Sequence, residues 1–421
     1  MEQVQRARQR AFCIAALPQG GDLSELSELL RTAGVAVAGE MIQQRDQPHP
    51  NTYLGPGKVI EAKAAALAAD ANLIACDDEL TARQERNLED ALGLPVVDRT
   101  TVILDIFAAH AASAEGKLQV ELAQLEYNLA RMRGLWSHLE RLGGGIGTRG
   151  PGETQIETDR RLARDRIAVL RRRLEHVKGA RAVQRAERER AALPGVALVG
   201  YTNAGKSTLL NVLTGAEVGV RDRLFNTLDP TTRTFSVGGR QALLSDTVGF
   251  ISKLPHELID SFTATLEETR RADLLLHVLD ASAPEQLAAV MQHSVEQTLE
   301  EIGAGERPRL LVLNKVDLLD EEQRDELRFR QPDAVLVSGV SGVGLDQLRA
   351  RIDHELQRTL RPVELLVPYA DGGCLSELHR IAGDLTRSDT PEGVRVRALL
   401  PARLAERFAR FAVAPHGAGG L

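Results

Sequence analysis

Residues 200–208 read Gly-Tyr-Thr-Asn-Ala-Gly-Lys-Ser-Thr and follow an apolar run at 196–199. The run predicts a buried parallel strand, and the leucine-rich segment from 209 predicts the start of a helix. A strand, a glycine loop and a helix with the spacing GxxxxGK[ST] predict a phosphate-binding loop, because glycines let consecutive N–H groups point at one phosphate. The helix N-terminus adds positive potential at the same place. We therefore expect Lys206 to contact the β- and γ-phosphates and the Ser207 hydroxyl to bind Mg²⁺.

Three further loops follow predicted strands and complete a nucleotide site. Asp246-Thr-Val-Gly249 follows the run at 242–245, and its carboxylate suits Mg²⁺ held through water while the glycine N–H suits a γ-phosphate. Asn314-Lys-Val-Asp317 follows 310–313, and the acceptor-only carboxylate of Asp317 matches the two adjacent donors of guanine. Ser338-Gly-Val340 follows 334–337 and offers a backbone N–H to the guanine carbonyl. Each of these short motifs, taken alone, occurs by chance. Their order along the chain, with each loop at the end of a strand, predicts a GTPase that hydrolyses GTP.

A first switch segment is expected between Arg221 and Arg233. One of its threonines should coordinate Mg²⁺ only while the γ-phosphate is present. By position we choose Thr227, with Thr231 as the alternative. The predicted nucleotide contacts are Gly200, Tyr201, Thr202, Asn203, Ala204, Gly205, Lys206, Ser207, Thr208, Phe225, Asn226, Thr227, Leu228, Asp229, Asp246, Thr247, Val248, Gly249, Asn314, Lys315, Val316, Asp317, Ser338, Gly339 and Val340. Of these, Lys206, Thr227 and Gly249 are predicted to act in catalysis, and Ser207 and Thr227 to bind Mg²⁺ directly.

The residue after Gly249 is Phe250, followed by Ile251, where many GTPases carry a glutamine that orients the attacking water. Neither side chain can form a hydrogen bond to a water molecule. The missing group therefore comes either from a partner or from a cation, and Asn203 is a candidate for holding K⁺ beside the phosphates.

The composition is that of an ordinary soluble protein with about three domains in 421 residues. The net charge of −7 argues against a general nucleic-acid coat, so any such contact must be local. Cys13 and Cys76 lie in apolar runs and are expected in the core, which fits a reducing compartment. No apolar run approaches a membrane span. We expect a cytoplasmic monomer that does not insert into a membrane, although transient association with one stays open.

Residues 11–112 alternate strand and helix signals, which predicts four βα units and a small parallel sheet. The predicted strands are 11–17, 35–43, 73–76 and 96–98, and the predicted helices are 22–33 with Asp22 as its cap, 58–69, 81–92 and 101–112. The glycine-rich turn at 53–58 resembles a fragment of a phosphate loop, but a plain helix entry explains it better.

Two long helices follow, with leucines and other apolar residues in alternating steps of four and three. The steps run from Leu118 through Trp136 to Leu139 in the first helix and from Ala163 to Val177 in the second, so the helices should pair as an antiparallel hairpin. The loop 143–153 that joins them holds six glycines in eleven residues. Between 131 and 190 there are sixteen Lys and Arg but only eight Asp and Glu. A charge run is usually a solvated helix face, but this one flanks a bare glycine loop in an acidic chain, which favours contact with folded RNA.

The predicted fold class is α/β. It comprises an N-terminal parallel α/β domain at 1–112, the helical hairpin with its glycine-rich tip at 113–193, a P-loop GTPase domain with a doubly wound sheet at 194–360, and a small C-terminal α/β domain at 361–421. The segment 187–192 should be a short charged connector.

The combined pattern resembles the HflX family of translational GTPases over about residues 50–350. The residues that carry the resemblance are those at 53–58, 98–100, 104–107, 118–125, 143–156, 200–208, 225–229, 246–251 and 254–256. The resemblance implies a factor that binds the large ribosomal subunit, reaches its ribosomal RNA with the hairpin tip and, with GTP bound, splits stalled or idle ribosomes under stress. It also implies Ser207 and Thr227 as Mg²⁺ ligands. Gly339 departs from the usual alanine.

Two other functions compete with this one. The first is a GTP-dependent factor for ribosome assembly or ribosomal RNA remodelling. The second is a non-ribosomal GTPase regulator that acts through a protein partner of its C-terminal domain or hairpin.

The base-reading assignment predicts the effect of Asp317→Asn. The asparagine amide presents an N–H donor to a position where guanine also has a donor. The preference of the site should therefore shift from guanine to xanthine nucleotides. Competition binding with GDP and XDP measures the shift, and Asp320→Asn, three residues along, is the matched control. Unchanged affinity for GDP in Asp317→Asn would remove the assignment.

Overall fold

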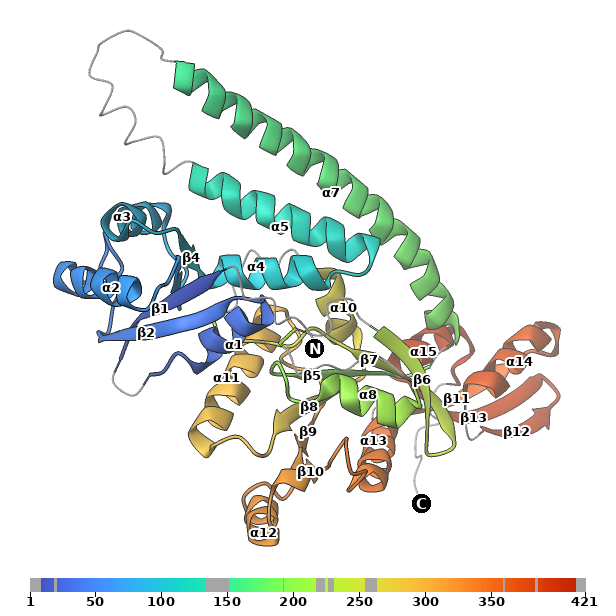
Figure 1. Cartoon of the computed structure of the whole chain (residues 1–421). Coiled ribbons are helices and arrows are strands. Elements are labelled where there is room, and N and C mark those ends of the chain that lie inside the picture. The colour runs from blue at the N-terminus through green and yellow to red at the C-terminus, as the bar shows by residue number, and fades with distance from the viewer. Residues whose placement is uncertain are drawn as a thin grey trace, which may run out of the picture. The chain divides into compact units, whose positions relative to one another are not determined.

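The computed structural model describes residues 9–18, 21–132, 151–191, 193–216, 224–225, 231–253, 263–358, 360–382 and 385–413 (Figure 1). The chain divides into two compact units. The first unit contains Met1–Gly179 together with Val220–Asp229 and Val248–Leu266, and the second contains the remainder. None of the helices within the described ranges is both long and apolar enough to cross a membrane.

The first unit is built on a parallel sheet with the strand order β2-β1-β3-β4 among its described residues. Strand β1 is buried from Ala11 to Leu17, and helices α2 and α3 pack on the face that carries Phe12 and Ile14. Cys13 and Cys76 are buried as predicted. The strands are β1 Arg10–Leu17, β2 Ala36–Gln44, β3 Leu73–Cys76 and β4 Val96–Asp98, and the helices are α1 Ser24–Thr32, α2 Pro56–Ala68, α3 Ala82–Leu92 and α4 Arg99–His110. The four predicted βα units are confirmed.

Three helix starts lie two residues from the prediction, and one of them is that of α2, which begins at Pro56. Helix α1 begins at Ser24 with Leu23 at its cap, so the prediction that Asp22 caps the helix is wrong. Instead, Asp22 Oδ1 accepts hydrogen bonds from the amide and the hydroxyl of Ser24, a local turn that competes with a helix cap. Helix α4 begins two residues earlier than predicted because Asp98 accepts the Thr101 N–H at 2.9 Å and caps it.

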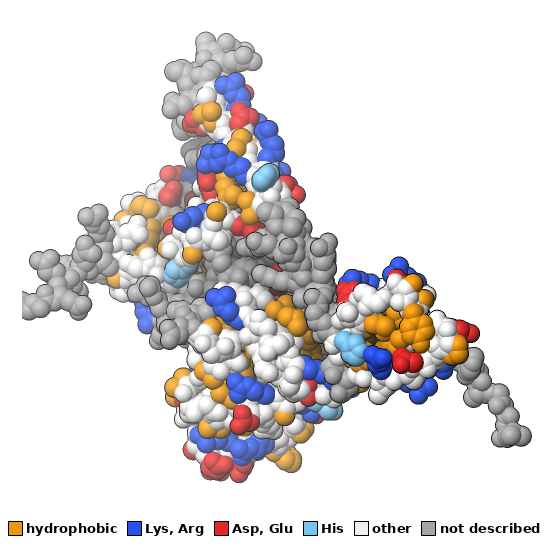
Figure 2. Space-filling view, turned by 90° about the vertical axis from the view of Figure 1, so that its right-hand side faces the viewer, with side chains coloured by type: hydrophobic (Ala, Val, Ile, Leu, Met, Phe, Trp, Pro, Cys, Tyr) orange, Lys and Arg blue, Asp and Glu red, His pale blue; other side chains and the backbone are white. Residues whose placement is uncertain are grey.

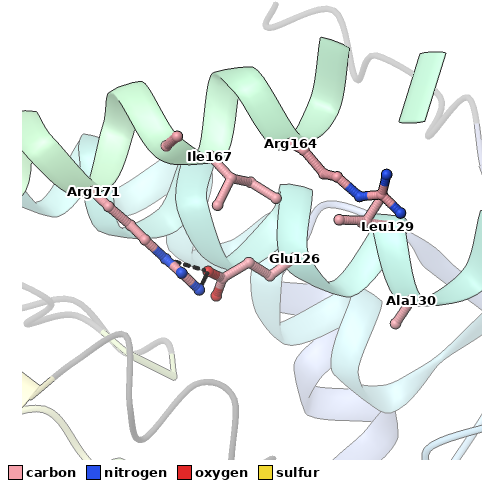
Figure 3. Close-up of a pocket in the computed structure, with 7 residues that line it drawn as sticks. Glu126, Leu129, Ala130, Arg164, Ile167 and Arg171 are labelled. Carbon is pink, nitrogen blue, oxygen red and sulfur yellow. Dashed lines mark hydrogen bonds and ion pairs between the residues drawn. The ribbon is translucent and has the colours of Figure 1, made fainter. Parts of the chain in front are cut away.

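The predicted hairpin is present as α5 (Ala114–Met132) and α7 (Pro151–Ala191), and we call this pair the arm. Within the first unit the two helices run antiparallel, side by side (Figure 1). Their apolar seam contains Leu118, Leu122, Leu125, Leu129, Ile167, Leu170 and Leu174. At the edge of the seam Ile167 and Leu129 line one groove, and Arg171 donates to Glu126 at 2.7 Å across it (Figure 3). Trp136, Leu139 and the loop 143–150 lie outside the described residues.

Two boundaries of the arm are corrected. Residues 151–153, predicted as the end of the glycine loop, are the first residues of α7. Proline is well suited to the first turn of a helix. The segment 187–191, predicted as a connector, continues α7, because its arginine, glutamate and alanine residues favour helix and nothing breaks it before Pro194.

The second unit contains a mostly parallel sheet with the order β10-β9-β8-β5-β7-β6 among the described strands. Only β6 is antiparallel to its neighbour within this sheet. The strands are β5 Gly195–Gly200, β6 Thr231–Val237, β7 Arg240–Asp246, β8 Leu274–Asp280, β9 Arg309–Asn314 and β10 Val335–Leu336, and the helices are α8 Lys206–Thr214, α10 Thr263–Arg271, α11 Glu285–Glu301, α12 Glu321–Arg330 and α13 Leu345–Arg358. Strands β6 and β8 were not predicted from the sequence, and Thr231, the alternative switch threonine, begins β6.

The C-terminal part of the second unit is an antiparallel sheet with the order β11-β13-β12. The sequence predicts strands at 363–368 and 394–400 and helices at 375–385 and 402–408 in this part. Helix α14 ends at Ile381 instead, because Leu385 begins β12, a strand that was not predicted. The other elements lie within three residues of the prediction. The elements are β11 Leu360–Val367, α14 Gly372–Ile381, β12 Leu385–Thr390, β13 Gly393–Pro401 and α15 Ala402–Arg407.

The seam of the arm predicts unequal effects of two leucine truncations on α7. Leu170 is fully buried, so Leu170→Ala should lower the free energy of opening the arm by about 2–4 kcal/mol. Leu162 on the same helix is 58% exposed, and Leu162→Ala should change it by less than about 0.5 kcal/mol. Amide hydrogen exchange of α5 and α7 measures both values locally. Equal effects would show that the seam does not hold the helices together.

Candidate active site

The glycine loop after β5 has the backbone that a phosphate cradle needs. Gly200 has φ +152° and Gly205 has φ +90°, both unfavourable for a residue with a side chain. A Cβ at Gly200 would lie 2.2 Å from the Val278 carbonyl oxygen, and one at Gly205 would lie 2.2 Å from Asn314 Nδ2. Both positions therefore exclude every other residue, and helix α8 starts directly after them at Lys206. The loop can present consecutive N–H groups to an anion at a helix N-terminus.

Lys206 is buried inside this loop. Its ammonium donates to the Gly200 carbonyl at 3.0 Å and to the Tyr201 carbonyl at 2.7 Å. Burial lowers the pKa of Lys206 to about 8, although the charge of Asp246 acts in the opposite direction. The loop thus holds a cation whose charge is incompletely compensated, which suits the oxygens of a phosphate.

Ser207 and Asp246 bring two hard oxygen ligands together beside the loop. The Ser207 hydroxyl donates to Asp246 Oδ2 at 2.6 Å, and Asp246 is fully buried at the end of β7. The Thr247 hydroxyl donates to the Leu198 carbonyl at 2.6 Å and fixes this strand end to β5. A hydroxyl and a carboxylate are the donor types that Mg²⁺ prefers, so these residues fit that ion.

Asn314 connects the glycine loop to the loop after β10. Its Nδ2 donates to the Ala204 carbonyl at 2.9 Å, and its Oδ1 accepts from the Gly339 N–H at 3.1 Å. A Cβ on Gly339 would lie 3.1 Å from Thr208 Cγ2, which is tight and fits the glycine found there. Asn314 therefore holds three segments of the site in register.

The remaining base-site residues stand on the same edge of the sheet. Asp317 is exposed in a 3₁₀ turn after β9, and the Ser338 hydroxyl accepts from the N–H of Val340 at 3.2 Å. Lys315 has φ +66° and pairs with Asp280 at 2.6 Å. Asp280 was not predicted from the sequence, although the apolar run of β8 that ends in an acidic residue is the same signal that identified Asp246.

The predicted switch residues belong to the first unit or lie outside the described residues. Asn226, Thr227, Leu228 and Asp229 lie outside the described residues, and their roles stay predictions. Phe225, Val248 and Gly249 belong to the first unit, where Phe225 is 2% exposed. Phe250 and Ile251 are also buried there. The site therefore gains no polar group for the attacking water from these two side chains.

The glycine loop, the buried lysine, the Ser207–Asp246 pair and the Asn314 bridge on a mostly parallel sheet define a P-loop GTPase. Three family descriptions match the chain in order: "GTP-binding GTPase N-terminal" over residues 21–108, "GTP-binding GTPase Middle Region" over 110–188 and "50S ribosome-binding GTPase" over 195–315. The GTPase HflX of Lacrimispora saccharolytica is 48% identical over 91% of this chain and 90% of its own length. Those of Caldanaerobacter subterraneus and Escherichia coli K12 are 44% and 46% identical, over 98% and 86% of this chain and 96% and 85% of their own lengths.

The chain therefore belongs to the HflX family of GTPases, and it binds GTP and hydrolyses it to GDP and phosphate.

The buried lysine predicts a pH dependence of nucleotide binding. A bound phosphate should raise the pKa of Lys206 from about 8 in the nucleotide-free protein. The complex then carries more protons than the free protein, so affinity for GDP should fall about threefold between about pH 7.5 and about pH 8.5. Calorimetry in buffers of different ionisation enthalpy should show proton uptake near pH 8. A flat affinity without proton uptake would contradict the assignment, and Lys206→Ala should lose both the uptake and most of the affinity.

Proposed function

We propose that this GTPase binds the large ribosomal subunit while it holds GTP, and that the bound form splits stalled or idle ribosomes under stress. The basic arm is the observation that carries the proposal. In an acidic chain, helix α7 carries a dense group of arginines, and Figure 2 shows Lys and Arg side chains gathered on the arm. Among the α7 residues whose side chains are described, the exposed arginines are Arg161, Arg164, Arg166, Arg171, Arg172 and Arg173. The family description "50S ribosome-binding GTPase" that matches residues 195–315 supports the same partner.

The shape of the arm suits contact with folded RNA. Two long helices are held together by an apolar seam, and the chain segment that joins them contains the glycine-rich residues 143–150. A stiff element of this kind delivers a glycine-rich backbone to a narrow RNA surface, while the arginines contact phosphates. We propose that the loop reaches ribosomal RNA and that the arginines position it.

The nucleotide roles that we propose are those predicted from the sequence, and the contacts of Lys206, Ser207, Asp246 and Asn314 support them. The loop at 200–208 cradles the phosphates, and Ser207 and Thr227 hold Mg²⁺, with Asp246 acting through water. Bound Mg²⁺ supplies charge neutralisation of the β- and γ-phosphates. The segments 314–317 and 338–340 bind guanine. Because Phe250 is buried, we propose that the ribosome supplies the group that orients the attacking water. K⁺ held beside Asn203 is the alternative source of catalytic stabilisation.

The segments 1–112, 113–193, 194–360 and 361–421 are the working parts of a cytoplasmic monomer in this proposal. The first carries the arm, the third binds the nucleotide, and the fourth is open to a further partner. Their boundaries are those predicted from the sequence.

Sedimentation with ribosomal particles tests the proposal directly. The full chain should sediment with large subunits in the presence of a non-hydrolysable GTP analogue and much less with GDP. The triple variant Arg161→Ala, Arg164→Ala, Arg173→Ala should weaken attachment and reduce the slope of log affinity against log salt by about 0.7–0.9 for each phosphate that is no longer neutralised. Arg328→Ala, Arg330→Ala on α12 is the matched control, because these exposed arginines pair with carboxylates of their own helix.

Two results would overturn the proposal in favour of its competitors. Tighter binding to free ribosomal RNA or precursor particles than to mature large subunits would indicate an assembly factor. Equal failure to bind any ribosomal particle in every nucleotide state would indicate a regulator that acts elsewhere.

A further inference from the structure

Both switch segments of the GTPase belong to the compact unit that carries the arm. The ranges Val220–Asp229 and Val248–Leu266 group with Met1–Gly179, whereas the phosphate loop belongs to the second unit. Their described residues are 224–225 and 248–253. The contacts that these residues make inside the first unit were not predicted from the sequence.

The second switch segment is held through Lys253, which lies four residues after Gly249. Its ammonium pairs with Asp77 Oδ2 at 2.9 Å and also with Asp78, directly after strand β3. Burial lowers the pKa of Lys253, but the carboxylates of Asp77 and Asp78 more than compensate, so the pKa is raised. Asp78 is itself fixed by the Tyr53 hydroxyl at 2.6 Å.

From Asp77 the ion pairs continue to the start of helix α4. Arg99, which is 2% exposed, binds Asp77 Oδ1 through Nη1 at 2.9 Å and Glu25 through Nη2 at 2.9 Å. Arg99 follows directly on the buried Asp98. A shift of Asp77 therefore acts on the first turn of α4.

Asp98 joins the same turn to the arm. Its Oδ2 accepts from Arg131 at 2.6 Å and from the Tyr127 hydroxyl, and both donors lie on α5. Arg131 also pairs with Glu85 at 2.9 Å, and its guanidinium stacks on the Tyr127 ring. The path from Lys253 to the arm thus runs through contiguous charged groups, most of them buried.

The first switch segment is held at the other end of α4. The Phe225 ring meets the Phe107 ring edge-on at 4.6 Å, and His110 Nδ1 donates to the Phe225 carbonyl at 3.0 Å. The Leu224 amide donates to the Thr32 hydroxyl at 3.4 Å. Helix α4 is therefore linked to both switch segments and, through its cap residue Asp98, to the arm.

The backbone at both anchors is unusual. Phe225 and Lys253 each have φ +55°, a left-handed conformation that a residue with a side chain seldom adopts. Such conformations persist where surrounding contacts over-determine them, and they cluster in switch regions. Static packing of two loops does not require a left-handed non-glycine residue in each loop.

We propose that helix α4 transmits the nucleotide state to the arm, with Lys253–Asp77–Arg99 as its link to the second switch segment and Phe225–Phe107 as its link to the first. GTP draws the segment after Gly249 towards the γ-phosphate, and this movement changes the ion pair between Lys253 and Asp77. The shift at Asp77 moves Arg99 and the Asp98 cap, and with them α5. Only the readout with ribosomes rests on the proposed function, because the link itself needs nothing beyond GTP binding.

Hydrogen exchange of the free full-length chain tests the link without ribosomes. In the wild type, amides of α4 and α5 should exchange differently with GDP and with a GTP analogue. Lys253→Met keeps the length of the side chain but removes its charge, and it should abolish the difference in α5 while leaving nucleotide affinity within about threefold of the wild type. Lys253→Arg should restore the difference. The matched control is Lys63→Met, which removes a lysine of the same unit whose ammonium donates to the Ala91 carbonyl at 2.9 Å.

A mutant cycle separates transmission from stability. If Lys253 and Asp77 act as one link, Asp77→Asn should abolish the nucleotide-dependent difference in the exchange of α5. The double variant should then lose no more of this difference than either single variant. If Lys253→Met changes exchange equally in both nucleotide states and leaves their difference intact, the contact is only structural and the proposal falls.

Large-subunit binding distinguishes failure of the link from failure of the function. The ratio of affinities with the GTP analogue and with GDP should lie between about 5 and 150 in the wild type and approach 1 in Lys253→Met. If the wild type ignores ribosomes but its exchange difference reaches α5 through Lys253, the proposed function fails and the link stands. If Lys253→Met keeps the full wild-type ratio, the function stands and the link fails.

Discussion

The buried carboxylate of Asp98 is the interaction on which the first unit depends. It is 2% exposed and accepts from the Leu80 and Thr101 amides, the Thr101 and Tyr127 hydroxyls and the guanidinium of Arg131. An ionised group at this depth is tolerated only when donors replace the water that it has lost. These donors come from three places in the chain, so satisfying one charge ties the start of α4 to Leu80, after strand β3, and to the last two turns of α5. The C-terminal end of α5, which precedes the segment that joins the two helices of the arm, is therefore fixed to α4.

The second unit obeys a similar constraint, applied to a binding site. Lys206 is held by two carbonyls of its own loop, and Asn314 uses both ends of its amide to join the glycine loop to the loop after β10. These bonds hold the loops in place before any ligand arrives, so less ordering is left for the moment of binding. The cost is a buried ammonium whose pKa lies well below that of an exposed lysine. A pocket that strains one charge in this way is suited to a ligand that carries the opposite charge.

The sequence predicted those parts that depend on short stretches of chain. The strand, glycine loop and helix at 195–214, the four βα units and the seam of the arm all follow from local periodicity and residue type. The prediction was wrong where local signals conflict: the glycines before Pro151 concealed a helix start, and Asp22 forms a turn where a cap was expected. It could not find the pairing of Lys253 with Asp77, which are 176 residues apart, because no local pattern encodes such a contact. It could have found β8 and Asp280, whose signal matches that of β7 and Asp246.

The chemistry of the contacts around α4 bears on how a switch can be built. An apolar core has one best packing and resists small displacements, so it suits the seam of the arm, where nothing needs to change. A buried ion pair adds little net stability, because desolvation offsets much of its attraction, yet breaking one partner away is costly. Such a pair adds little stability, but it fixes the relative position of the two segments that carry it. It does so because it distinguishes sharply between two arrangements of nearly equal free energy. The distribution of residues follows this division: leucines hold the arm together, whereas aspartates, arginines and one lysine connect it to the segment that follows Gly249.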